Sequence, residues 1–191
     1  MPLGLAWDGS GLWNVDGYNN TLYCLNRANG SQIRSLTSPL PSTTGIAYDS
    51  RDLWVCSETS VEIYKINLVS GEIQKRLNLQ RGSFTAIGYG QQALWLADLQ
   101  SNTIKKINPE TGEIQLSFSN PGIRADGIAF DGLSLWVSDP TSLTIYELTP
   151  EGNVRRKFLS PGQSPRGLAF DGYYYWNVDG NQKIYQLRVL K

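Results

Sequence analysis

The chain of 191 residues contains no histidine, although it contains 17 acidic and 17 basic residues. Histidine is the usual general base at neutral pH and a common metal ligand, and it activates serine and cysteine nucleophiles. No metal-ligand spacing replaces it among the acidic residues and cysteines. We therefore expect no enzymatic activity, no bound metal and no cofactor.

The two cysteines, Cys24 and Cys56, are too few for a disulfide framework. Two small buried thiols are the first interpretation, and a disulfide between neighbouring repeats is the alternative. The acidic residues show more order. In four repeats an aspartate ends a segment rich in β-forming residues: Asp16, Asp98, Asp139 and Asp179. In the second repeat the equivalent residue is Ser57. We expect their oxygens to accept hydrogen bonds from the turn that follows; a ring of carboxylates that binds cations is the alternative.

The formal net charge is zero, which argues against binding along a nucleic-acid backbone, because such binding needs clustered Lys and Arg. No apolar run approaches the ~20 residues of a membrane-spanning helix. The first residues, Met1-Pro-Leu-Gly, do not resemble a signal peptide. We expect a soluble protein without membrane or nucleic-acid partners, and its compartment is left open.

The residues that could do chemistry lie on a chain that repeats itself about every 41 residues. A glycine or alanine, an aliphatic residue, a small residue and an aromatic residue recur at this step, beginning at Gly4, Gly45, Ala86, Gly127 and Gly167. One tryptophan follows in each repeat, at Trp13, Trp54, Trp95, Trp136 and Trp176. Self-similarity at this period is typical of solenoids and propellers.

One repeat contains four short segments with the alternation of β-strands. In the fourth repeat these segments are residues 127–130, 135–139, 144–149 and 153–158, separated by turns with Asp-Gly, Pro and Gly. Four antiparallel strands form a propeller blade, which must pack on neighbouring blades to bury its faces. The small residues of the first strand would permit close approach near the axis. We expect the tryptophans to fill the space between blades, and a row of exposed tryptophans that stack on ligands is the alternative.

The sequence therefore predicts an all-β protein, a five-bladed β-propeller in one domain over residues 1–191. The repeats span residues of about 4–44, 45–85, 86–126, 127–166 and 167–191. The last repeat has no counterpart of residues 152–158, so its blade is expected to lack the outer strand. Three explanations are open: a three-stranded blade, a part of a longer propeller, or a strand supplied by another chain. The edge from Gln182 to Lys191 is a candidate for self-association.

Residues at the entry to each first strand vary where the rest of the repeat is regular. In a propeller these residues meet at one mouth of the central channel, where ligands commonly bind. Ordinary loop variation is the competing explanation. The candidate ligand-binding residues are Thr44, Thr85, Asp126, Arg166, Arg81, Phe84 and Arg124.

The run from Gly127-Ile-Ala-Phe-Asp-Gly through Leu135-Trp-Val-Ser-Asp to Pro150-Glu-Gly resembles the NHL-repeat propellers and related bacterial propellers. The resemblance covers the whole chain and implies the propeller fold. Its members include protein-binding, RNA-binding and sensor modules and a few enzymes.

Two enzyme groups are similar in repeat pattern. Streptogramin lyases use a catalytic histidine, which this chain lacks. Plant-type glutaminyl cyclases carry a catalytic glutamate in a Glu-Ser-Thr-Gly stretch between the second and third strands, and the nearest counterpart here is Ser57-Glu58-Thr59-Ser60. We expect Glu58 to be a solvated turn residue and the chain to be a non-catalytic module that binds a protein or small ligand. The alternatives are an enzyme of the glutaminyl cyclase type and a purely structural repeat protein or fragment.

Overall fold

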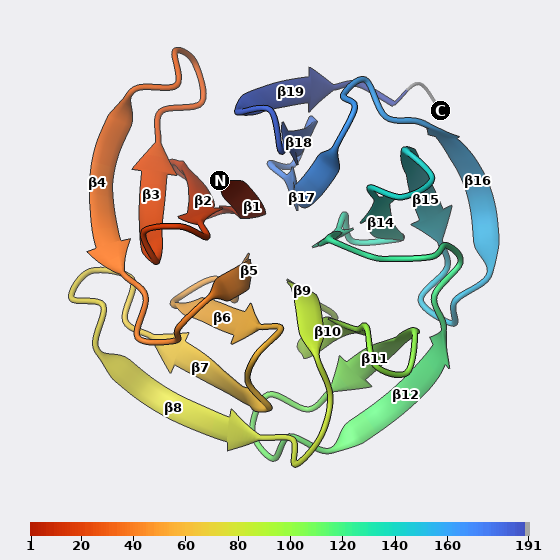
Figure 1. Cartoon of the computed structure of the whole chain (residues 1–191), viewed down its shortest axis with the longest axis horizontal. Coiled ribbons are helices and arrows are strands. Elements are labelled where there is room, and N and C mark those ends of the chain that lie inside the picture. The colour runs from red at the N-terminus through yellow and green to blue at the C-terminus, as the bar shows by residue number, and fades with distance from the viewer. Residues whose placement is uncertain (190–191) are drawn as a thin grey trace.

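The computed structural model describes residues 1–189, which form nineteen strands and no helix (Figure 1). The strands make five antiparallel sheets around a central axis, and each sheet consists of strands that are consecutive in the sequence. The predicted five-bladed, all-β propeller is confirmed. Within the described residues, no helix is present that could cross a membrane.

The blades have the following strands. Blade 1 contains β1 (Pro2–Trp7), β2 (Leu12–Asp16), β3 (Thr21–Leu25) and β4 (Gln32–Thr37). Blade 2 contains β5 (Thr43–Tyr48), β6 (Leu53–Ser57), β7 (Glu62–Ile66) and β8 (Ile73–Asn78). Blade 3 contains β9 (Phe84–Gly90), β10 (Ala93–Asp98), β11 (Thr103–Ile107) and β12 (Ile114–Ser119). Blade 4 contains β13 (Gly127–Phe130), β14 (Leu135–Asp139), β15 (Thr144–Leu148) and β16 (Val154–Leu159). Blade 5 contains β17 (Pro165–Phe170), β18 (Tyr175–Asp179) and β19 (Lys183–Leu187).

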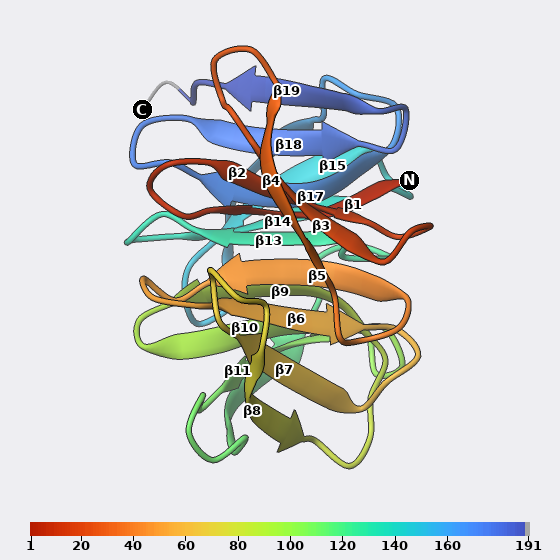
Figure 2. The same cartoon turned by 90° about the vertical axis from the view of Figure 1, so that its left-hand side faces the viewer.

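The first strand of each blade lies next to the axis and the fourth lies at the rim (Figure 1). Because neighbouring strands are antiparallel, the turns between second and third strands share one face with the connections that lead into the next blade. We call this face the mouth face. The turns between first and second strands, and between third and fourth strands, lie on the opposite face. Figure 2 shows the blades from the side, with their strands running between the two faces.

Small residues in the first strands allow neighbouring blades to approach closely. A Cβ atom added to Gly45 would lie 2.9 Å from the backbone nitrogen of Ile87 in the next blade. At the closure of the ring, a Cβ atom on Gly167 would lie 2.4 Å from the nitrogen of Leu5. Glycine is therefore required at these two positions by the space available, as the repeat predicts.

The five tryptophans are buried between blades, as predicted, with exposed fractions from 0% to 6%. Each is the cross-strand neighbour of the small residue in its first strand; Trp54 pairs with Ala47, and Trp95 pairs with Gly88. The small partner leaves room for the indole ring, which packs against the following blade. Trp54, for example, shares a core cluster with Ile87 of blade 3.

The ring closes where β1 lies beside β17, and blade 5 has three strands (Figure 1). The expected absence of an outer strand is confirmed for the described residues. The predicted assembly edge extends to Lys191, but residues 190 and 191 lie outside the described residues. Ile184 in β19 is partly exposed, whereas its register equivalents in the complete blades are buried: Leu22, Ile63, Ile104 and Ile145.

Candidate functional site

Four charged side chains from different parts of the ring meet on the mouth face, and we call them the mouth cluster. Glu58 lies in the turn between β6 and β7, Arg124 and Asp126 lie in the connection between β12 and β13, and Arg166 lies in β17. Arg124 donates from Nη2 to the Glu58 carboxylate and from Nε to Asp126 Oδ1 at 2.5 Å. Arg166 donates from Nη1 to Asp126 Oδ2. The chain of ion pairs thus runs from blade 2 to blade 5.

The mouth cluster is electrically neutral and half-buried. The Asp126 side chain is 5% exposed, whereas those of Arg124, Glu58 and Arg166 are 26%, 31% and 23% exposed. Burial lowers the pKa of Arg124, but the carboxylates of Asp126 and Glu58 outweigh it and raise that pKa above its ordinary value. Arg166 Nε is buried and has no hydrogen-bond partner among the described residues. The cluster therefore offers a carboxylate that can accept a proton and guanidinium groups that can bind an anion or a carbonyl oxygen.

The structure places the seven predicted ligand-binding residues in four different environments. Arg124, Asp126 and Arg166 belong to the mouth cluster. Thr44 and Thr85 connect neighbouring blades: Thr44 Oγ1 donates to the carbonyl oxygen of Phe84 in β9 at 2.8 Å, and Thr85 Oγ1 donates to that of Ala125, just before β13.

The two remaining predicted residues lie apart from the mouth cluster. Phe84 is fully buried in the core between blades 2 and 3, with its ring over Gly82. Arg81 is exposed and lines a separate cavity between these two blades. Sequence reasoning assigned Glu58 to solvent, because a turn glutamate in one blade gives no sign of an arginine 66 positions later. The carboxylate instead lies in the mouth cluster.

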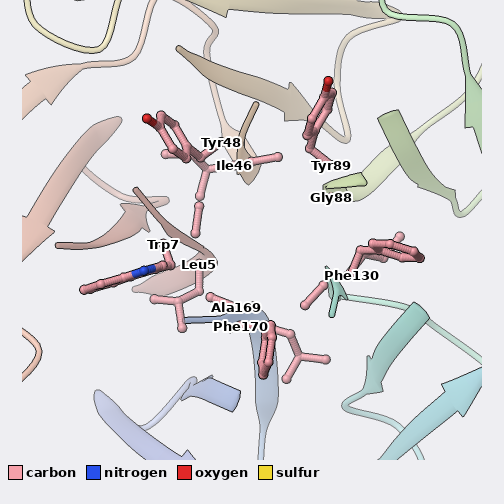
Figure 3. A pocket seen from close by; sticks show the side chains of 14 residues that line it. Leu5, Trp7, Ile46, Tyr48, Gly88, Tyr89, Phe130, Ala169 and Phe170 are labelled. Carbon is pink, nitrogen blue, oxygen red and sulfur yellow. The ribbon is translucent and has the colours of Figure 1, made fainter. Parts of the chain in front are cut away.

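Below the mouth cluster, aliphatic side chains fill the channel. The five that close it are buried to at least 97%: Leu5, Ile46, Ile87, Ile128 and Leu168. On the opposite face the channel opens into a cavity of about 70 Å³ (Figure 3). Aromatic residues from the ends of the first strands surround this cavity, including Trp7, Tyr48, Tyr89, Phe130 and Phe170. It is smaller than the ~300–1,000 Å³ of ordinary ligand pockets, and the charged groups that could bind a polar ligand lie on the mouth face.

The aspartates at the ends of the second strands bond to turns, as predicted. Asp98 Oδ1 accepts the amide N–H of Gln100 and that of Ser83, each at 3.0 Å, and Asp139 Oδ1 accepts that of Thr141 at 2.8 Å. The described residues contain no cluster of three or more His, Cys, Asp or Glu side chains suited to a metal ion.

A second set of aspartates has a role that the sequence analysis missed. Asp8, Asp49, Asp131 and Asp171 follow the first strands, and each accepts the indole N–H of its own blade's tryptophan at 2.8 to 2.9 Å. Burial raises the pKa of Asp131, but hydrogen bonds from Tyr175, from two backbone amides and from Trp136 outweigh it, and the net pKa is lowered. The signal was available, because this aspartate precedes the tryptophan by five residues in each of these four repeats.

Both cysteines are free and buried, so the interpretation as two separate thiols is confirmed and the disulfide alternative is wrong. Burial raises the pKa of Cys56 to about 12. A thiol with this pKa is not a nucleophile at neutral pH, because the thiolate is the reactive form.

No family model matches the sequence, and no curated protein matches it either. Solved structures do match. The glutaminyl cyclase of Myxococcus xanthus superposes with a TM-score of 0.80 at 12% sequence identity, over 98% of this chain and 89% of that one. The virginiamycin B lyase of Staphylococcus aureus superposes with a TM-score of 0.63 at 23% identity, over 99% of this chain and 66% of that one. At these identities the likeness shows the propeller fold, and the NHL-repeat resemblance is not shown beyond that fold.

These neighbours correct one expectation from the sequence. The chain was predicted not to be an enzyme because it lacks histidine and metal-ligand spacings, yet structures similar to it over almost its whole length are enzymes. The reasoning was wrong because it treated histidine as necessary for proton transfer. A carboxylate positioned by ion pairs can also accept and donate a proton, and the mouth cluster contains two, those of Glu58 and Asp126.

Proposed function

We propose that the mouth cluster is a binding site for a small polar ligand that carries both hydrogen-bond donors and a carbonyl or anionic group. The observation that supports this most is the convergence of Glu58, Arg124, Asp126 and Arg166 from three separate segments of the chain onto one mouth of the channel. A free amine would bind to the carboxylate of Glu58, and a carbonyl or carboxylate oxygen would bind to the guanidinium groups. The amino-terminal residue of a peptide has both kinds of group within a few ångströms.

Such a ligand would exchange partners with the ion pairs. Glu58 and Arg124 are about one quarter to one third exposed, so a ligand can reach them from solvent. Asp126 is almost completely buried and accepts from both arginines, so it keeps the guanidinium groups in place. In this proposal Asp126 is a positioning residue, and the other three contact the ligand.

A second candidate function is cyclisation of amino-terminal glutamine. Two observations favour it: Glu58 lies between the second and third strands of its blade, where the resemblance to plant-type glutaminyl cyclases predicts the catalytic glutamate, and the Myxococcus xanthus glutaminyl cyclase spans 98% of the chain. In this reaction the α-amino nitrogen forms a bond to the side-chain carbonyl carbon of glutamine. The bond from that carbon to the side-chain nitrogen breaks, and ammonia leaves. Glu58 would accept the proton from the attacking amine and return it to the leaving nitrogen.

The lyase reaction has less support. One solved neighbour is a histidine-to-alanine variant of virginiamycin B lyase that is described as catalytically inactive. This chain has no histidine to supply the same group.

Titration with a glutaminyl dipeptide amide, followed by calorimetry and mass spectrometry, tests both functions at once. We expect saturable binding that weakens at least about tenfold in Arg166→Gln, since one charged hydrogen bond is worth about 1.5–3 kcal/mol. Glu72→Gln is the matched control, because Glu72 is an exposed glutamate in a turn on the opposite face. Acetylation of the peptide amine should also abolish binding.

The outcomes separate the two functions. Loss of 17 Da from the peptide at a rate that falls in Glu58→Gln, but not in Glu72→Gln, would establish cyclisation. Binding without this mass change would leave the ligand site and remove the cyclase. Equal affinity of the wild type, Arg166→Gln and Glu58→Gln for the peptide would contradict the proposed site itself.

A further inference from the structure

A cavity of about 500 Å³ lies between blades 2 and 3, outside the mouth cluster. Its volume falls within the range of ordinary ligand pockets. Leu79, Phe84 and Ile107 form apolar walls, and Arg81, Asp98 and Lys105 supply charged groups. A smaller cavity, of about 290 Å³, lies between blades 1 and 5 and is lined by Tyr23 and Ile184 among others.

The cavity arises from one exception to the repeat. The central residue of the third strand faces the preceding blade, and in four blades it is a tyrosine: Tyr23, Tyr64, Tyr146 and Tyr185. In blade 3 the same register position, opposite Leu96, is Lys105. Tyr64 packs on the core between blades 1 and 2, and Tyr146 packs on that between blades 3 and 4. Blade 3 therefore lacks a phenol ring at a place where its neighbours have one.

Two further exceptions shape the same cavity. Leu79 follows the fourth strand of blade 2, and its backbone N–H donates to a carbonyl oxygen just before the third strand. The residues that make the same backbone bond in the other complete blades, and are therefore equivalent, are Ser38, Asn120 and Ser160. An apolar wall thus replaces a small polar residue. Two positions later, Leu40 is buried in the core between blades 1 and 2, whereas Arg81 is exposed at the rim of the cavity.

The charges in the cavity are unbalanced by one positive charge. Lys105 Nζ donates to Asp98 Oδ2 at 2.5 Å, and its side chain is 13% exposed. Asp98 also accepts from Ser101 Oγ at 2.7 Å and from two backbone amides, so both carboxylate oxygens are occupied. Lys105 uses one of its three N–H groups in bonds to the described residues, and Arg81 forms no ion pair with them.

We propose that this cavity binds an aromatic carboxylate, with its ring in the space that tyrosine fills in the other blades and its carboxylate on Lys105 and Arg81. The apolar walls and the missing phenol ring favour a planar aromatic group. The two spare N–H groups of Lys105 and the guanidinium of Arg81 favour an anion over a neutral or cationic head group. The site lies between blades and shares no lining residue with the mouth cluster, although Ser83 bonds both to Asp98 and to the backbone carbonyl oxygen of Glu58.

The probe is 4-hydroxyphenylacetate, which is a tyrosine side chain with a carboxylate, and tyramine is its cationic counterpart. Binding to the full chain is measured by two-dimensional amide NMR titration. We expect saturable shifts at residues around Lys105 with the acid, and an affinity for tyramine that is at least about tenfold weaker. Lys105→Tyr restores the tyrosine of the other blades, fills the cavity and should abolish binding while the protein stays folded.

Two more variants keep the test decisive. Lys105→Met removes the charge without filling the cavity with a ring, so it should weaken the acid at least about tenfold even if Lys105→Tyr does not fold. Lys106→Met is the matched control, because Lys106 is the next residue, faces the opposite side of the sheet and bonds to Gln91; it should bind the acid as the wild type does. The proposal is overturned if the wild type shows no saturable binding at millimolar acid, or if Lys105→Tyr and Lys105→Met bind as tightly as the wild type.

Discussion

Replacement of Trp95 by alanine should remove about 4 kcal/mol from the free energy of unfolding. Trp95 is fully buried between blades 3 and 4, and its ring is stacked on Phe130 at a centroid distance of 6.4 Å. An aromatic side chain of this size buries about 150–250 Å², which corresponds to about 4–6 kcal/mol at 25 cal/mol per Å². Compactness of the unfolded chain lowers that value, and measured Phe or Trp to Ala changes in cores cost about 3–5 kcal/mol.

The same substitution at Trp176 should cost less, by at least about 1 kcal/mol. Trp95 is covered on its outer side by Phe118 of the fourth strand, at 6.4 Å, but the part of the chain that the structure describes has no fourth strand in blade 5. Trp176 is accordingly 6% exposed, and its neighbour Gln186 in β19 is exposed. The pair of variants therefore separates burial between blades from the general effect of removing a tryptophan.

Urea unfolding followed by circular dichroism measures both variants, because tryptophan fluorescence changes with the substitution itself. Thermal unfolding should show a fall in Tm of about 8–16 °C for Trp95→Ala, at about 2–4 °C per kcal/mol for a chain of this length. A loss below about 1 kcal/mol would refute the burial of Trp95 between blades. A larger loss in Trp176→Ala than in Trp95→Ala would refute the role of the outer strand.

Three further predictions concern the turns and the edge. The pKa values of Asp49 and Asp131 are lowered in the folded protein, so these carboxylates bind protons less readily there than in the unfolded chain. The free energy of unfolding should therefore be constant above pH ~5 and fall as the pH drops below about 4 towards the folded pKa values. Equal urea midpoints at pH 6 and pH 3 would contradict this. Gly90→Asp restores the aspartate of the other repeats, but the new Cβ atom would lie 2.3 Å from Cδ1 of Phe130. The variant should therefore be less stable than the wild type by about 1–3 kcal/mol, and a more stable variant would contradict this close contact. We propose that the outer edge of β19 either pairs between copies of the chain or frays; slow amide exchange at residues 184–189 in a protein that sediments as a monomer would exclude both.

The architecture was predictable from the sequence because the same repeat determines both the strands within a blade and the contacts between blades. Gly4, Gly45, Gly127 and Gly167 recur where first strands approach each other, and the tryptophans recur where blades meet, so one spacing encodes both the blade and its neighbour. The three-stranded last blade followed from the same spacing. The indole acceptors were missed although Asp8 and its equivalents keep a constant spacing to the tryptophan, because an aspartate there also satisfies the ordinary preference of turns for aspartate.

The mouth cluster was predictable only in part. The variable entry positions pointed to Arg124, Asp126 and Arg166, because loop residues on a regular scaffold converge at the axis. Phe84 lies next to these entry positions, but its side chain points into the core. The sequence does not show where the strand begins, and so it does not show which residues at its start face the core. Glu58 was missed because its partner is contributed by a different blade.

The repeat also supplies an internal reference that a single site lacks. Each position of a blade occurs up to five times in the chain, so the other blades show what the scaffold alone requires there. Tyrosine in four blades shows that the fold accommodates a ring at the third-strand position, whereas blade 3 has Lys105 there, paired with Asp98. The exception opens a cavity and introduces a cation into it at the same time. A ligand bound in this cavity would account for both exceptions, and this is why the interface between blades 2 and 3, and not only the mouth cluster, is worth testing for a ligand.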